Sequence, residues 1–185
     1  MAVEDFILKA EESLLLVIDI QERLAAAMSK REKVVGNVLH LLELARLKDL
    51  PVVVTEQYPK GLGPTVPELT EALARATRAE KLCFSCCGEA GFTERLRAAG
   101  RKNAVVCGME THVCVLMTAL DLLREGFVVH VVSDAVCSRH KDNWITALAM
   151  LRDAGAVVTS TESVLFQLLE RAGSDEFKAI SKRIR

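Results

Sequence analysis

Two side chains in this sequence stand where an α/β fold would place reactive groups. Asp19 closes the apolar run Ser-Leu-Leu-Leu-Val-Ile-Asp, and Cys114 lies in Cys-Gly-Met-Glu-Thr-His-Val-Cys-Val, near the expected start of a helix. A helix start offers unpaired N–H groups and a positive dipole end, which favour a thiolate and can hold an oxyanion. A carboxylate that ends a strand can act as a general base. The alternatives are a helix cap or solvated strand end for Asp19 and a buried structural thiol for Cys114.

The remaining candidates carry weaker signals. Nothing in its neighbourhood singles out Lys81. Cys83, Cys86 and Cys87 form a cluster with C-x-x-C spacing, but no second Cys or His pair completes a zinc site, and packing is the favoured interpretation. The four histidines show no ligand spacing, and only His112 lies near Cys114. The sequence therefore predicts neither a metal site nor a cofactor.

The elements that must position these residues alternate between apolar runs and helical stripes. Residues 13–19, 52–55, 103–107, 127–132 and 156–159 are the expected strands, and residues 31–48, 113–126, 144–151, 164–169 and 177–184 are the expected helices. This order predicts a parallel sheet with helices on both faces, whose ligand site lies at the carboxyl ends of the strands. That rule points to Asp19, Thr55 with Glu56, Cys107 with Gly108, and Asp134. The turn-rich segment 56–67 is the expected pocket wall.

Composition limits the classes of partner. Lys plus Arg is 24 and Asp plus Glu is 25 in 185 residues, and aromatic residues make up 4%, which argues against nucleic acid and anionic membranes. The N-terminus lacks the pattern of a secretory signal, and no apolar stretch reaches the ~20 residues of a membrane span. We expect a single domain over residues 1–185, a cytoplasmic location and six reduced cysteines.

Four blocks of sequence together resemble the isochorismatase-like (cysteine hydrolase) superfamily, which includes nicotinamidases and N-carbamoylsarcosine amidohydrolase. They are Leu-Val-Ile-Asp-Ile-Gln at 16–21, Lys81 before Phe84-Ser85, Val-Val-Cys-Gly-Met-Glu-Thr-His-Val-Cys-Val at 105–115, and Val-Val-Ser-Asp-Ala at 131–135. The block at 105–115 is the most specific. The resemblance spans the chain from about residue 12 to about residue 170.

The resemblance implies a fold and a site. The fold is a three-layer α/β/α Rossmann-like arrangement around a six-stranded parallel sheet. The site is a catalytic triad of Asp19 as base, Lys81 as fixed cation and Cys114 as nucleophile. A cis peptide between Met109 and Glu110 would direct the N–H groups of Glu110 and Cys114 into an oxyanion hole.

The residues expected to contact a small-molecule substrate are Gln21, Glu56, Gln57, Tyr58, Phe84, Thr111 and His112. A homo-oligomer, a dimer or a tetramer, is also implied, with Leu39 and Leu44 as a contact face.

Departures from the family patterns narrow the expected reaction. Nicotinamidases carry metal-binding histidines after the second strand, where this chain reads Thr-Glu-Gln-Tyr-Pro-Lys-Gly-Leu-Gly. Enzymes that cleave the vinyl ether of isochorismate lack the nucleophilic cysteine, which is present here. We therefore predict a metal-independent amidohydrolase that cleaves a small amide or related C–N bond other than a peptide bond through a thioester. A non-catalytic binding protein that keeps the fold and a thiol redox sensor are the alternatives.

Overall fold

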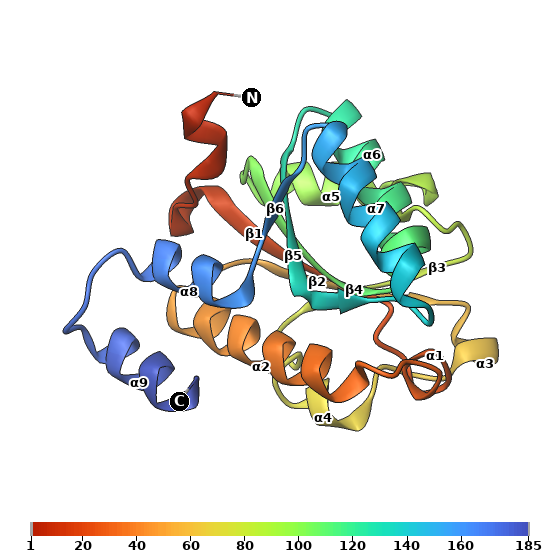
Figure 1. The fold of residues 1–185 in the computed structure, drawn as a ribbon, viewed down its shortest axis with the longest axis horizontal. Coiled ribbons are helices and arrows are strands. Elements are labelled where there is room, and N and C mark those ends of the chain that lie inside the picture. Colours follow the sequence, from red (N-terminus) through yellow and green to blue (C-terminus); the bar gives the residue numbers. More distant parts are fainter. Residues whose placement is uncertain (1, 185) are drawn as a thin grey trace.

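A single parallel sheet forms the centre of the computed structural model, which describes residues 2–184. Its six strands run in the order β3-β2-β1-β4-β5-β6 (Figure 1). The strands are β1 (Ser13–Ile18), β2 (Val52–Gln57), β3 (Thr77–Lys81), β4 (Asn103–Met109), β5 (Val128–Cys137) and β6 (Val157–Thr159). With helices on both faces of this sheet, the three-layer α/β/α Rossmann-like fold is confirmed.

Two groups of helices cover the two faces of the sheet (Figure 1). One face carries α2 (Arg31–Leu47), α8 (Thr161–Leu169) and α9 (Asp175–Arg183), and the other carries α5 (Phe92–Ala98), α6 (Leu116–Arg124) and α7 (Lys141–Asp153). Shorter elements are η1 (Val3–Phe6), η2 (Ala10–Glu12), α1 (Glu22–Ala26), α3 (Pro59–Leu62), α4 (Pro67–Thr70), η3 (Cys86–Gly88) and η4, the π-helix Thr111–Val115.

The continuous apolar runs of β1 and β4 exist because both of their faces are covered. Every residue of these two strands is buried. Leu15 and Val17 enter the core beneath α2, whereas Leu14 and Leu16 enter the core beneath α6. Alternation along a strand therefore supplies both cores from one run, as a buried parallel strand requires.

Two strands differ from the sequence-based expectation. β3 was not predicted from the residues, because it is an edge strand in which only Lys81 is fully buried, so it carries no apolar run. β5 continues to Cys137, so the prediction that Asp134 ends a strand is wrong. Asp134 instead anchors α8, since its Oδ1 accepts hydrogen bonds from Thr161 N at 2.7 Å and Thr161 Oγ1 at 2.8 Å.

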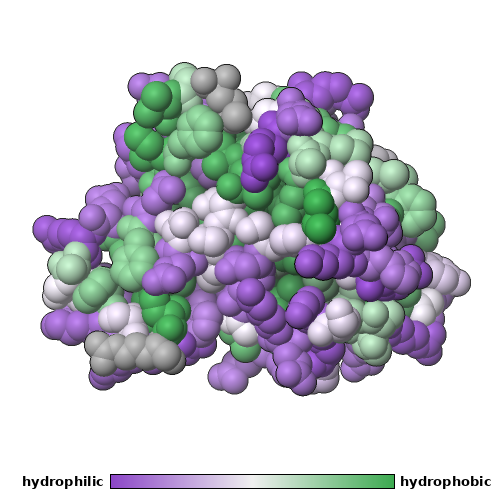
Figure 2. Space-filling view, viewed as in Figure 1, coloured by the Kyte–Doolittle hydropathy of each residue, from purple (hydrophilic) through white to green (hydrophobic). Residues whose placement is uncertain are grey.

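The outer face in Figure 2 is mostly hydrophilic, with apolar atoms gathered over the N-terminal segment, where Val3, Phe6 and Ile7 are exposed. None of the helices within residues 2–184 is long and apolar enough to cross a membrane. Leu44 is 1% exposed and belongs to the core of its own chain, so it cannot serve in the predicted oligomer contact. Leu39 is partly buried against the same core.

Candidate active site

Neighbouring strand ends bring the predicted triad to one edge of the sheet. Asp19 directly follows β1, Lys81 ends β3, and Cys114 lies in η4, which follows β4. β2 lies between β1 and β3 and pairs Thr55 with Ile18 and Gln57 with Lys81. Because all these strands are parallel, their carboxyl ends meet at the same edge, as in other open α/β sheets.

A buried ion pair lies at the centre of this edge. Lys81 Nζ is 2.6 Å from Asp19 Oδ2, and the two side chains are 1% and 0% exposed. The ammonium also donates to Gln57 Oε1 at 2.6 Å and to the carbonyl oxygens of Phe84 at 3.2 Å and Cys83 at 3.3 Å. Burial, the largest single influence, would lower the pKa of Lys81, but the charge and hydrogen bond of Asp19, together with Cys86 and Cys114, outweigh it and the net shift is upward. Lys81 is therefore a fixed cation whose donors are all used.

Cys114 faces both charges but is protonated at neutral pH. It is 5% exposed, and burial raises its pKa to about 12, with the charge of Asp19 acting in the same direction and that of Lys81 opposing it. Burial therefore opposes the thiolate that a helix start would favour. The turn is also π-helical, not α-helical. A thiol in this setting needs a base before it can act as a nucleophile.

The loop between β4 and η4 has an unusual backbone. The peptide bond between Met109 and Glu110 is cis, at the position implied by the family resemblance. The Glu110 carboxylate is 7% exposed, and it accepts hydrogen bonds from the backbone N of Arg139 at 2.9 Å and from its Nε at 3.1 Å. Arg139 follows β5, so this contact ties the loop to the neighbouring strand end.

Three of the residues expected to bind substrate use their polar groups in hydrogen bonds within the protein. Gln21 Nε2 donates to the carbonyl oxygens of Gln57 and Gly63, and its Oε1 accepts from Gln57 N. Gln57 Oε1 accepts from Lys81, and its Nε2 donates to Leu82 O. Glu56 Oε1 accepts from Thr65 N and Oγ1. These contacts hold the loop that follows β2 against Gln21, close to the end of β1.

The other four expected substrate contacts divide into exposed and buried side chains. Tyr58 and Phe84 are 51% and 56% exposed, although each flanks a residue of the Lys81 network. Thr111 is fully buried, and its Oγ1 has no hydrogen-bond partner within residues 2–184. His112 is held between Ser138 Oγ at 2.9 Å and Asn143 Nδ2 at 3.3 Å, which fixes the plane of its ring.

Several supporting residues were missed from the sequence. Thr55 was noted only as a strand end, yet its Oγ1 donates to Asp19 Oδ1 at 2.7 Å. Cys86 was interpreted as packing, yet its Sγ lies 3.9 Å from Thr55 Oγ1 and its charge would act on Lys81. Arg139 carried no signal. The polar ending of β2, Thr-Glu-Gln after three valines, was the one sequence feature that could have identified Thr55 and Gln57 as parts of the site.

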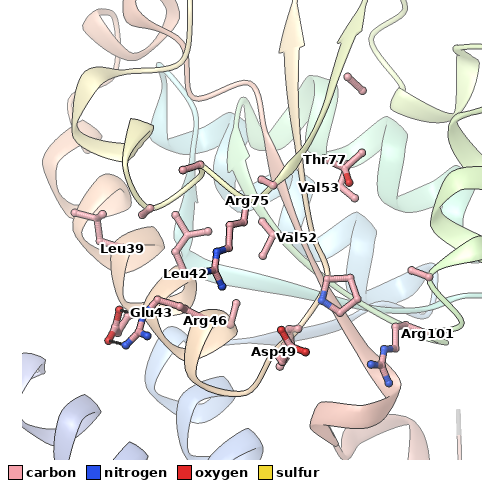
Figure 3. Close-up of a pocket in the computed structure, with 18 of the residues that line it drawn as sticks. Leu39, Leu42, Glu43, Arg46, Asp49, Val52, Val53, Arg75, Thr77 and Arg101 are labelled. Atoms are coloured by element: carbon pink, nitrogen blue, oxygen red, sulfur yellow. Dashed lines mark hydrogen bonds and ion pairs between the residues drawn. The ribbon is translucent and has the colours of Figure 1, made fainter.

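A groove of about 930 Å³ lies away from the triad (Figure 3). It is lined by the end of α2, by the amino ends of β2 and β3 and by α5, and no triad residue contributes to it. In Figure 3, Arg75 extends toward Leu42, and Glu43 pairs with Arg46. Within residues 2–184, no group of three or more His, Cys, Asp or Glu side chains is arranged to hold a metal ion.

The sequence matches the family model described as "Isochorismatase domain" over residues 13–163. Among curated proteins it is similar to isochorismatase domain-containing protein 2A of Mus musculus, with 40% identity over 176 residues that cover 95% of this chain and 84% of the relative.

Three solved structures are similar over almost the whole chain. One is titled a MAR1 ribonuclease from Caenorhabditis elegans, with 37% identity, a TM-score of 0.90, and coverage of 96% of this chain and 92% of that one. YcaC from Pseudomonas aeruginosa, solved with hexane-2,5-diol and covalent acrylamide, has 28% identity, a TM-score of 0.92 and coverage of 99% and 93%. The YcaC product of Escherichia coli, titled an octameric hydrolase of unknown specificity, has 26% identity, a TM-score of 0.90 and coverage of 96% and 90%.

Proposed function

The chain belongs to the isochorismatase family, and on this premise we propose that it is a cysteine hydrolase that cleaves the C–N bond of a small amide without a metal. The observation that carries the proposal is the buried ion pair between Asp19 and Lys81 beside the Cys114 thiol. A buried ion pair costs desolvation energy that packing alone does not require. A base, a fixed cation and a thiol in one place are the parts of nucleophilic acyl transfer.

The first half of the reaction forms a thioester. Asp19 takes the proton of Cys114 as the sulfur attacks the amide carbonyl, and the oxyanion that develops binds the backbone N–H groups of Glu110 and Cys114. Asp19 then gives the proton to the leaving nitrogen, and the C–N bond breaks. Lys81 holds the carboxylate in place and keeps a positive charge near the developing thiolate. Because Lys81 is saturated with acceptors, it moves no proton.

The second half returns the enzyme to its starting state. Asp19 takes a proton from a water molecule that attacks the thioester carbonyl, and the acid leaves as the proton passes back to the sulfur of Cys114. We assign Gln21, Glu56 and Gln57 to holding the site together, since their polar groups are used internally. Tyr58, Phe84, Thr111 and His112 remain as the residues proposed to meet substrate.

The proposal extends to the location, the assembly and the substrate class of the enzyme. All six cysteines are free thiols, which supports a reducing, cytoplasmic location. Because a solved relative is octameric, we propose that this chain also works as a homo-oligomer. The near-balanced charge argues that the substrate is a small molecule and not a nucleic acid.

The test is ammonia release from a panel of primary amides by the full chain and by the Cys114→Ala variant. We expect one or a few amides to be cleaved and the variant to lose at least about 10³-fold in kcat/KM, because it lacks the nucleophile. Circular dichroism and thermal melting of both proteins check that the fold is unchanged. Full activity in Cys114→Ala would rule out the cysteine mechanism.

RNA belongs in the same panel, because a relative with 37% identity is titled a ribonuclease. We expect no RNA cleavage, since the charge is nearly balanced and aromatic residues make up only 4% of the chain. RNA cleavage that disappears in Cys114→Ala would replace the amide proposal with phosphodiester chemistry at the same site.

A further inference from the structure

The two carboxylate oxygens of Asp19 are held differently. Oδ1 accepts a hydrogen bond from Thr55 Oγ1 at 2.7 Å. Oδ2 lies 2.6 Å from the Lys81 ammonium as an ion pair, but it has no aligned hydrogen-bond partner within residues 2–184. A buried carboxylate oxygen in this state has room for one more donor. The thiol of Cys114 is close enough for the charge of Asp19 to act on it and to raise its pKa.

Thr55 holds Asp19 from both ends. Its backbone oxygen accepts from Asp19 N at 3.2 Å, while its hydroxyl donates to Oδ1 of the same residue. Asp19 has a φ of 51°, in the left-handed region that a strand end adopts when the chain turns sharply. With the backbone and side chain of Asp19 both tied to one residue of the adjacent strand, rotation about χ1 and χ2 is restricted.

The Thr55 hydroxyl is in turn in contact with the thiol of Cys86. Cys86 Sγ lies 3.9 Å from Thr55 Oγ1, within reach of a weak S–H donor. Cys86 is fully buried, and burial raises its pKa to about 12, so it is a neutral thiol that can donate. Its backbone N donates to Thr118 Oγ1 at 3.0 Å, which holds the donor in place. A hydroxyl that accepts from Cys86 directs its own proton to Asp19.

We propose that Thr55, held by Cys86, is a positioning residue that occupies Oδ1 of Asp19 and so leaves Oδ2 as the oxygen that takes the Cys114 proton. The inference rests on the proposed function, because it assigns a role within the same proton transfer. The chain of hydrogen bonds runs from the Cys86 thiol through the Thr55 hydroxyl to Oδ1 of Asp19. This chain transfers no proton, and its role is to orient the carboxylate.

The test measures how fast acrylamide alkylates Cys114 across pH 5 to 10, by peptide mass spectrometry, in Thr55→Val and Thr55→Ser. In this reaction the sulfur bonds to the terminal alkene carbon and a proton ends on the α-carbon, so no turnover of a natural substrate is needed. We expect Thr55→Val to be roughly ten- to hundredfold slower at neutral pH, because the carboxylate is no longer held in the orientation that presents Oδ2 to the thiol. The difference from the parent should be largest near neutral pH and should shrink toward pH 10, where hydroxide removes the thiol proton without the help of Asp19. Thr55→Ser keeps the hydroxyl and should stay within about threefold of the parent.

The chain offers a matched control in Thr161→Val. Thr161 Oγ1 also donates to a carboxylate, Asp134 Oδ1 at 2.8 Å, but in a place remote from the triad. We expect this variant to lose stability to a similar degree and to keep the parent's alkylation profile. If Thr55→Val differs from the parent only in thermal stability, with the same pH profile, the positioning role is wrong.

The remaining outcomes separate this inference from the proposed function. Alkylation that depends on Thr55, together with no cleavage of any amide, would support the positioning role and reject the amide substrate. A parent protein whose Cys114 is not alkylated at any pH would overturn both. Turnover of an amide that Thr55→Val leaves unchanged in kcat and in pH profile would keep the function and reject the inference.

Discussion

At the scale of the residue, the central feature is that Lys81 and Asp19 are charged in a place with almost no water. Lys81 donates to three neutral oxygens and is paired with one carboxylate, whereas Asp19 depends on Lys81 and Thr55. Removing one charge of such a pair leaves the other uncompensated in a medium of low polarity. The pair therefore contributes to folding as well as to chemistry, and the two contributions can be separated.

Lys81→Met tests the contribution to folding. We expect it to reduce the free energy of unfolding by about 3–5 kcal/mol, because Asp19 stays buried without its cation. The double variant Asp19→Asn with Lys81→Met should be more stable than Lys81→Met alone, since no unpaired charge remains. Guanidinium chloride unfolding at neutral pH measures both. Asp19→Asn alone completes the set, and a double variant whose loss equals the sum of the losses in the two single variants would show that the two charges do not interact.

Sequence reasoning found the reactive groups of the site but not what holds them. Asp19 and Cys114 were found because strand ends and helix starts are visible in a hydrophobic pattern. Lys81 emerged only through resemblance, since the strand that carries it has no apolar run. Thr55 and Gln57 act through contacts across strands, and the register that creates those contacts is not written in either segment alone. Whether these side chains perform the proposed roles stays a prediction.

At the scale of the element, the approach of β1 to β4 depends on one glycine. Gly108 pairs with Ile18, one residue before Asp19, and has a φ of 127°. A Cβ at this position would lie 2.0 Å from the backbone oxygen of Ile18. No rotamer can relieve a clash with backbone, so only glycine allows the strand ends to come together beneath the site.

Gly108→Ala should destabilise the protein by more than about 3 kcal/mol, through both the clash and the disallowed φ. The matched control is Gly36→Ala within α2, where a Cβ would meet nothing within 4 Å. That change should stabilise the protein by about 0.5–1 kcal/mol, because alanine favours the helix. Thermal melts of the two variants should shift in opposite directions. A Gly108→Ala protein as stable as the parent would contradict the strand-end packing described here.

The strand pattern also explains which elements the sequence could reveal. Continuous apolar runs predict β1, β2 and β4, because central parallel strands must be apolar on both faces. β3 lies at the sheet edge and tolerates Thr77, Arg78 and Glu80 in exposed positions. β5 continues through Ser133 and Asp134, whose polar side chains hydrogen-bond to the end of β6 and the start of α8. The hydrophobic pattern therefore does not predict edge strands or the exact ends of strands.

At the scale of the whole molecule, the N-terminal segment closes one side of the core. Leu8 is buried in the core beneath α2, and its N donates to Gln167 Oε1 of α8 at 2.8 Å. Beneath this segment lies His130 of β5, which is fully buried and has no hydrogen-bond partner for either ring nitrogen within residues 2–184. Burial lowers its pKa to about 4, and Asp5 opposes that shift only in part. The ring is therefore neutral in the folded protein at physiological pH.

This histidine should make the stability of the fold depend on pH. Above about pH 6.5 the ring is neutral both folded and unfolded, so it contributes no pH dependence. As the pH falls from 6.5 toward 4, the unfolded chain binds a proton that the folded protein refuses, and the unfolding free energy decreases. The loss should approach about 3 kcal/mol and be complete near pH 4.

The variant His130→Leu tests this, because it removes the proton uptake while filling the same space. Its unfolding free energy should fall less steeply than that of the parent when both are measured by urea denaturation at pH 7.5, 6, 5 and 4. Carboxylates titrate in both proteins, so the difference between the two curves isolates His130. Parallel curves would show that the ring is protonated within the fold, and that the N-terminal segment admits water to it.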